Sequence, residues 1–67
     1  MTRAQAQAAV DDAFKDAISR VFGVLVGNLE GGDPDSTKKF LTVLDIHARA
    51  HEIASAAVAV RFQEVAS

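Results

Sequence analysis

The residues best suited to chemistry in this sequence are two histidines, His47 and His51, four positions apart. On a helix that spacing places both imidazoles on one face, one turn apart, where they can share a divalent metal ion. If the chain folds back on itself near its middle, residues whose numbers add to roughly 63 lie level with one another. His51 is then level with Asp12 and His47 with Asp16. Asp11, at the edge of the apolar face, is the carboxylate best placed to accept a hydrogen bond.

The histidine pair has three interpretations, and we favour the structural one. In it, each histidine donates a hydrogen bond to a carboxylate such as Asp11, or to a group on a second chain, and fixes the register of the helices. In the second, a dimer brings two or four imidazoles together with Asp11 or Glu52, a ligand set that suits zinc. In the third, protonation of the histidines near pH 6 loosens an apolar interface.

The candidate metal ligands are therefore His47 and His51, with Asp11 as a further ligand, but no known metal motif supports them. The Glu-x-x-His pair of di-iron bundles is missing. Ser55 stands where the second histidine of the HExxH motif would follow His51. We expect no bound cofactor.

Support for catalysis is weak. The sequence has no cysteine and no tyrosine, and it lacks a glycine-rich phosphate loop with a following lysine. Its serines have no base at a recognisable spacing, and two helices offer little concave volume. The sequence predicts a protein that is not an enzyme.

The histidines belong to a long predicted helix that is apolar around most of its circumference. Its polar residues gather on one narrow face; they are Thr42, Asp45, Arg49, Glu52 and Gln63. A helix with one neighbour needs an apolar stripe only about 100° wide. This helix therefore has enough apolar surface for two or three neighbours and is predicted at the centre of a bundle.

A second helix is predicted over residues 3–29. Thr2 and Gln5 have the spacing of a capping box at its start. Its apolar residues recur every three or four positions on one face, as expected for packing on a single neighbour. Gly23 and Gly27 are read as glycines tolerated near a helix end, or as a strip that lets another helix approach closely.

The break between the helices is EGGDPDS at residues 30–36. Gly31 or Gly32 can take the left-handed conformation that ends a helix, Asp33 can cap the next helix, and Pro34 fits its first turn. Because the connection is short, the helices should be antiparallel. We predict one all-α domain, residues 1–67, built as a helical hairpin with helices over about 3–29 and 34–66 and a turn at 30–33.

Size and composition favour self-association. The chain has 67 residues, of which 49% are hydrophobic, and no cysteine for a disulfide. Single cores of this size are marginal, so the hairpin is predicted to form a homodimeric four-helix bundle, with a tetramer as the alternative. The predicted interface positions are Phe14, Ile18, Val21, Phe22, Leu25, Val43, His47, Ala50, His51, Ala54, Val58 and Phe62. This arrangement resembles that of the plasmid RNA-binding hairpin Rop, in architecture and not in any motif.

The leading functional hypothesis is a small homo-oligomer that acts through protein–protein contacts as an adaptor, regulator or assembly factor. Its partner is itself, with another protein as an option. A net charge of −2 disfavours nucleic acid. A Rop-like RNA-binding face with Arg3, Lys15 and Arg20 is the weakest alternative, because Asp12 and Asp16 interrupt it. No long apolar run is free of charge, and the N-terminus has no signal-like apolar stretch, so we expect a cytoplasmic protein that does not enter the membrane.

Overall fold

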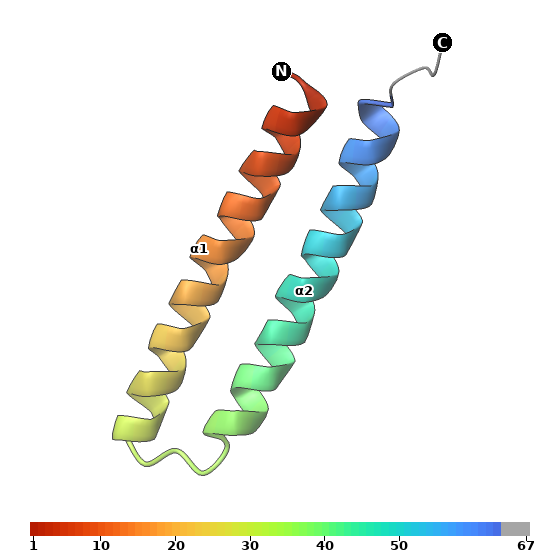
Figure 1. Cartoon of the computed structure of the whole chain (residues 1–67). Coiled ribbons are helices and arrows are strands. Elements are labelled where there is room, and N and C mark those ends of the chain that lie inside the picture. The colour runs from red at the N-terminus through yellow and green to blue at the C-terminus, as the bar shows by residue number, and fades with distance from the viewer. Residues whose placement is uncertain (64–67) are drawn as a thin grey trace.

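The structure, a computed structural model, describes residues 1–63. It contains two helices, α1 over Arg3–Glu30 and α2 over Ser36–Arg61, which lie side by side as an antiparallel hairpin (Figure 1). No strand occurs within this stretch of the chain. The predicted all-α hairpin is confirmed.

The start of α1 is held by the predicted capping box. The Gln5 backbone N–H donates to Thr2 Oγ1 at 3.1 Å, and the Thr2 backbone N–H donates to Gln5 Oε1 at 2.9 Å. Two amides that have no partner inside the helix are thereby satisfied. This local motif needs no tertiary contact, which is why sequence spacing alone could find it.

The end of α1 is a Schellman motif centred on Gly32. The Gly32 N–H donates to the Leu29 carbonyl at 3.1 Å, and the Asp33 N–H donates to the Asn28 carbonyl at 2.9 Å. The motif requires a left-handed residue, and Gly32 has φ +73°. Of the two glycines predicted for this conformation, Gly32 adopts it, because a residue without Cβ bears no steric penalty there.

The predicted start of the second helix at residue 34 is wrong by two residues. Asp33 does not cap the helix; its Oδ1 accepts from the Asp35 N–H at 2.9 Å, and its carbonyl accepts from the Ser36 hydroxyl at 2.6 Å. These bonds fold residues 33–36 into a tight turn, which leaves Pro34 outside the helix. Asp35 occupies the N-cap position without a side-chain cap bond.

The predicted end of the second helix at residue 66 is also wrong. The helix ends at Arg61, where the N–H of the following Phe62 donates to the Val58 carbonyl at 2.9 Å. By the register of the hairpin, α2 reaches the level of the first residue of α1 at about this point. No helical residue of α1 lies level with Phe62 or Gln63, and packing on a neighbouring helix supplies most helix stability in a protein. The predicted residues 64–66 lie outside the described residues.

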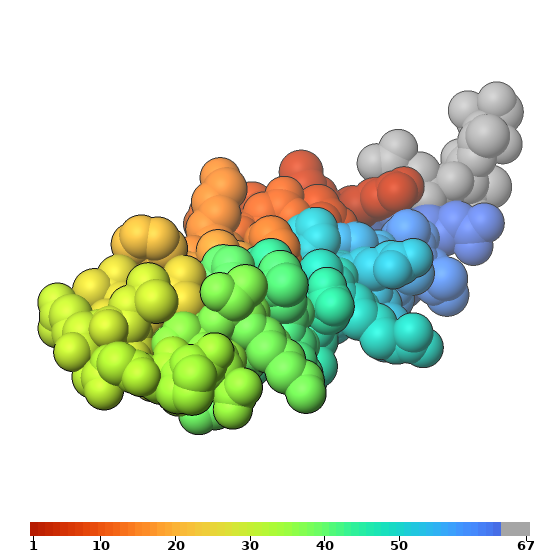
Figure 2. All heavy atoms as spheres, turned by 90° about the horizontal axis from the view of Figure 1, so that it is seen from below, coloured from red at the N-terminus to blue at the C-terminus, as the bar shows by residue number. Residues whose placement is uncertain are grey.

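The hairpin is one layer thick and has almost no core. It measures 58 × 16 × 11 Å along its principal axes, and the space-filling view shows the two helices lying along one another (Figure 2). Within residues 1–63 the only buried apolar side chains are those of Ala6 and Val21. The half-buried apolar residues and histidines of the seam between the helices are Val10, Phe14, Ala17, Ile18, Leu25, Phe40, Leu44, His47, His51, Ala54, Val58, Ala59 and Phe62.

Candidate interaction surface

A small polar network joins the helices near their open end. His51 Nε2 lies 2.8 Å from Asp11 Oδ1, and Gln7 Nε2 donates both to Asp11 Oδ1 and to Ser55 Oγ at 3.0 Å. Because a carboxylate only accepts, Nε2 of His51 must be the protonated donor. The expected pairing of His51 with Asp11 is present. The contribution of Gln7 and Ser55 was missed, although the same register rule places these two residues level with one another.

An aromatic contact holds the His51 ring in place. The ring of Phe14 lies with its centroid 4.6 Å from the His51 centroid, at an interplanar angle of 43°. The His51 side chain is about one-third exposed. Phe14 and His51, both predicted as interface residues, thus meet each other inside one hairpin.

His47 has a different environment from His51. Its Nδ1 lies 2.8 Å from the carbonyl of Val43, one turn earlier in α2, so Nδ1 is the donor. Asp16, which the register rule placed level with His47, pairs with Arg20 on its own helix. Each of these two residues therefore bonds within its own helix.

The network lowers the pKa of Asp11 below its ordinary value of 3.8. The largest cause is the hydrogen bond from His51, followed by the bond from Gln7, since both stabilise the ionised carboxylate. A protonated His51 would meet a counter-charge here. The expectation that protonated histidines loosen an interface between two copies stays a prediction.

A single hairpin does not assemble a metal centre from the residues described. No group of three or more His, Cys, Asp or Glu side chains in positions 1–63 is placed to hold an ion. His47 and His51 each use one ring nitrogen in a hydrogen bond, which leaves the other nitrogen as a candidate ligand. The predicted metal site would need ligands from a second chain.

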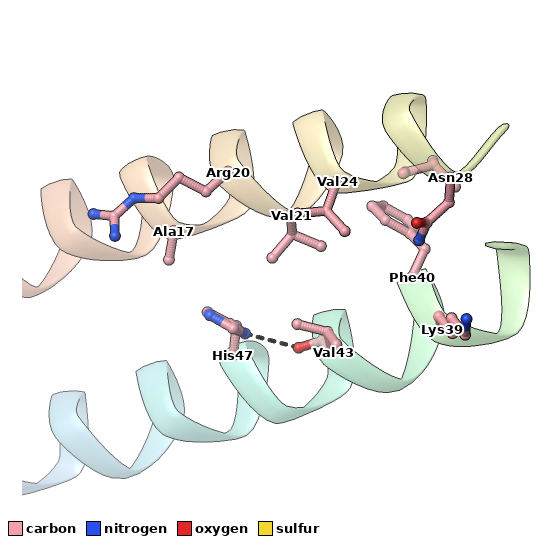
Figure 3. A pocket seen from close by; sticks show the side chains of 10 residues that line it. Ala17, Arg20, Val21, Val24, Asn28, Lys39, Phe40, Val43 and His47 are labelled. Carbon is pink, nitrogen blue, oxygen red and sulfur yellow. Dashed lines mark hydrogen bonds between the residues drawn. The ribbon is translucent and has the colours of Figure 1, made fainter. Parts of the chain in front are cut away.

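An open apolar groove of about 400 Å³ lies toward the turn, between α1 and α2 (Figure 3). Val21 and Val24 from α1 and Phe40 and Val43 from α2 supply its apolar surface. Two cations lie at its rim, but each is paired: Arg20 with Asp16, and Lys39 with Asp33. The groove therefore offers an apolar contact surface and no free charge for an anion.

The predicted interface residues divide into two sets. Nine lie buried or half-buried in the seam of the hairpin itself, whereas Phe22, Val43 and Ala50 are exposed. The structure also exposes aliphatic side chains of α2 that the predicted set omitted, among them Ile46 at 60%, Ile53 at 59% and Val60 at 75%. Sequence periodicity placed these residues on the apolar side of α2 but could not tell how much of that side α1 would cover.

Comparisons with protein-family models, with curated proteins and with solved structures gave no match to this chain. Neither α1 nor α2 is long and apolar enough to cross a membrane.

Proposed function

We propose that this chain is a small homo-oligomeric helical protein that acts through protein–protein contacts as an adaptor, regulator or assembly factor, and not as an enzyme. The proposed unit is a homodimer that forms a four-helix bundle, with a tetramer as the alternative. The cytoplasm is the proposed setting.

The observation that carries this proposal is the apolar surface left on a single hairpin. The chain exposes 5187 Å², whereas a compact monomer of 7.1 kDa exposes about 4,100 Å². This excess, about 1,100 Å² of polar and apolar surface together, arises because each helix has a neighbouring helix on one side only. Within residues 1–63, ten large hydrophobic residues contribute to the exposed surface. A patch of this kind marks an association surface in soluble proteins.

Sedimentation equilibrium at micromolar concentration tests the proposal. We expect a mass of about twice the 7.1 kDa of one chain for the dimer, or about four times that mass for the tetramer. A folded helical species that sediments as a single chain would refute the proposal, because it would show that the exposed apolar surface is tolerated in water.

A metal-binding bundle is the second candidate. It is favoured by the two histidines on one face of α2. Each uses one ring nitrogen in a hydrogen bond, so the second ring nitrogen is a candidate metal ligand. Association of two hairpins would supply the further ligands that one lacks. Elemental analysis of the purified protein, together with its melting temperature with and without zinc or nickel, decides the matter. A bound metal, or a rise in melting temperature that His47→Gln abolishes, supports this candidate, and the absence of both removes it.

A further inference from the structure

A regular apolar stripe runs along the side of α2 that α1 leaves uncovered. Its residues alternate at spacings of three and four, the pattern of the a and d positions of a coiled coil. They are Val43, Ile46, Ala50, Ile53, Ala57 and Val60, and we call them the α2 stripe. Every one of them is exposed; Val43, at 37%, also lines the groove between α1 and α2. No charged residue interrupts the stripe.

The α2 stripe is distinct from the seam of the hairpin. The half-buried residues that face α1, such as His47, His51 and Val58, lie about a third of a turn away around the helix axis. A helix that packs on one neighbour needs a single stripe, and α2 has two. Since α1 occupies the first, the second is free for another helix.

We propose that the occupant of the α2 stripe is the same stripe of a second copy, packed antiparallel about a two-fold axis that passes between Ala50 and Ile53. This proposal rests on the proposed homo-oligomer and specifies its interface. A two-fold interface must be complementary to itself. The order of residues in the stripe meets that condition well when the two copies of α2 are antiparallel, and poorly when they are parallel.

The sizes of the side chains favour the antiparallel direction. In an antiparallel pair centred between Ala50 and Ile53, each a position meets a d position of the other copy. Ala50 then faces Ile53, and Ala57 faces Ile46, so that every small residue meets a large one. Val43 faces Val60 at each end. The layers are therefore of similar volume, as close packing of an interface requires.

The parallel direction gives mismatched layers. There each residue meets its own copy, so Ala50 faces Ala50 and Ala57 faces Ala57, while Ile46 and Ile53 also meet themselves. Layers of two alanines leave voids next to crowded layers of two isoleucines. Voids and overpacking are both destabilising, so the parallel pair is the poorer interface.

A matched pair of substitutions tests the location of the interface. Ile53→Asp places a charge in the stripe, and Leu41→Asp places one at a side chain of similar exposure, 50% against 59%, outside the stripe. We expect Ile53→Asp to weaken association by roughly 100-fold or more, because a charge would lose its water, whereas Leu41→Asp should change it by less than about threefold. The readout is the dissociation constant from sedimentation across a dilution series.

The outcomes separate this proposal from the proposed function. If the unmodified chain is a monomer, both are refuted. If it is a dimer and Ile53→Asp associates as well as the unmodified chain, the α2 stripe is not the interface, while the homo-oligomer stands.

Exchange of the residues at positions 50 and 53 tests whether the two copies of α2 pack antiparallel. In the antiparallel pair, Ala50→Ile crowds a layer and Ile53→Ala empties it, so each should weaken association about tenfold or more. The double variant restores the pairing of one alanine with one isoleucine and should recover most of the loss. Single variants that weaken association with no recovery in the double variant would contradict the antiparallel arrangement.

Distances between spin labels give a readout that does not depend on stability. The chain has no native cysteine, so a single cysteine can be placed at Thr42 or at Arg49, both exposed beside the stripe. With a rise of 1.5 Å per residue and helix axes about 10 Å apart, the antiparallel pair predicts a separation between copies that is about 15–20 Å longer at residue 42 than at residue 49. Equal separations at the two positions would show a parallel pair and overturn the proposal.

Discussion

His51 of α2 donates a hydrogen bond to Asp11 of α1 across 2.8 Å, at the same register as the bond from Gln7 to Ser55 one turn away. Four residues forward along α1 correspond to four residues back along α2, as antiparallel helices require. Apolar side chains in a thin seam can slide past one another, whereas these bonds lose their partners if the helices shift by one turn. The network therefore specifies the register of the hairpin.

The carboxylate of Asp11 should make stability depend on pH in acid. Its pKa in the folded chain is lowered below 3.8, so the unfolded chain binds the proton more tightly. The contribution to stability is present above pH 3.8 and is lost as the pH falls through the lowered pKa. We expect Asp11→Asn to reduce the fall in melting temperature on acidification below about pH 4. Asp12→Asn, at an exposed neighbour, is the control, and an acid response of Asp11→Asn equal to that of the unmodified chain would contradict the account.

Gln7 should contribute to stability through both of its bonds. Gln7→Ala removes the donor to Asp11 and to Ser55, and we expect the free energy of unfolding to fall by about 0.5–1.5 kcal/mol. Ser55→Ala removes one of the two bonds and should cost less. Urea unfolding followed by circular dichroism measures both variants. A larger loss for Ser55→Ala than for Gln7→Ala would show that the network is not arranged in this way.

Two glycines should respond to alanine in opposite directions. An added Cβ at Gly23 meets no atom within 4 Å, so Gly23→Ala should raise the free energy of unfolding by about 0.5–1 kcal/mol through helix propensity. Gly32 has φ +73°, a conformation that is strained for alanine, so Gly32→Ala should lower the free energy of unfolding by about 1–2 kcal/mol. Destabilisation by Gly23→Ala would instead favour the alternative in which another helix approaches α1 closely at Gly23 and Gly27.

Ala54 lies half-buried on α2, facing the seam. Ala54→Leu adds volume where α1 is already close, and we expect it to cost about 1–3 kcal/mol. Ala56→Leu, at an exposed position of the same helix, should have little effect. Chemical unfolding of both variants is the measurement, and equal stability of the two would mean that Ala54 is not packed.

Local signals were the easiest to read from the sequence. The capping box of Thr2 and Gln5 and the left-handed Gly32 involve residues close together in the chain, and both are present. The bounds of α2 were harder to predict. Its start depends on which donors in the turn bond to the side-chain and carbonyl oxygens of Asp33. Its end lies level with the start of α1, and the periodicity of α2 does not report where that level falls.

The sequence predicted the part of the candidate site that depends on the register of the two helices. The contact of His51 with Asp11 follows from the turn position, whereas His47 took a carbonyl of its own helix instead of a neighbouring carboxylate. The division of the apolar face of α2 was not predictable, because a pattern of side chains does not say how much of that face a single neighbour covers. Only the position of α1 separates the seam from the α2 stripe.

The most direct test of the account is the melting temperature as a function of protein concentration. A hairpin with only Ala6 and Val21 as buried apolar residues among its described positions should be unable to stay folded alone, so folding and association should be coupled. Thermal unfolding followed by circular dichroism from about 1 to 100 μM should give a melting temperature that rises steadily with concentration, with loss of helix on dilution. A melting temperature that does not change over this range, in a chain that sediments as a folded monomer, would show that the hairpin folds without a partner and would contradict the proposed homo-oligomer.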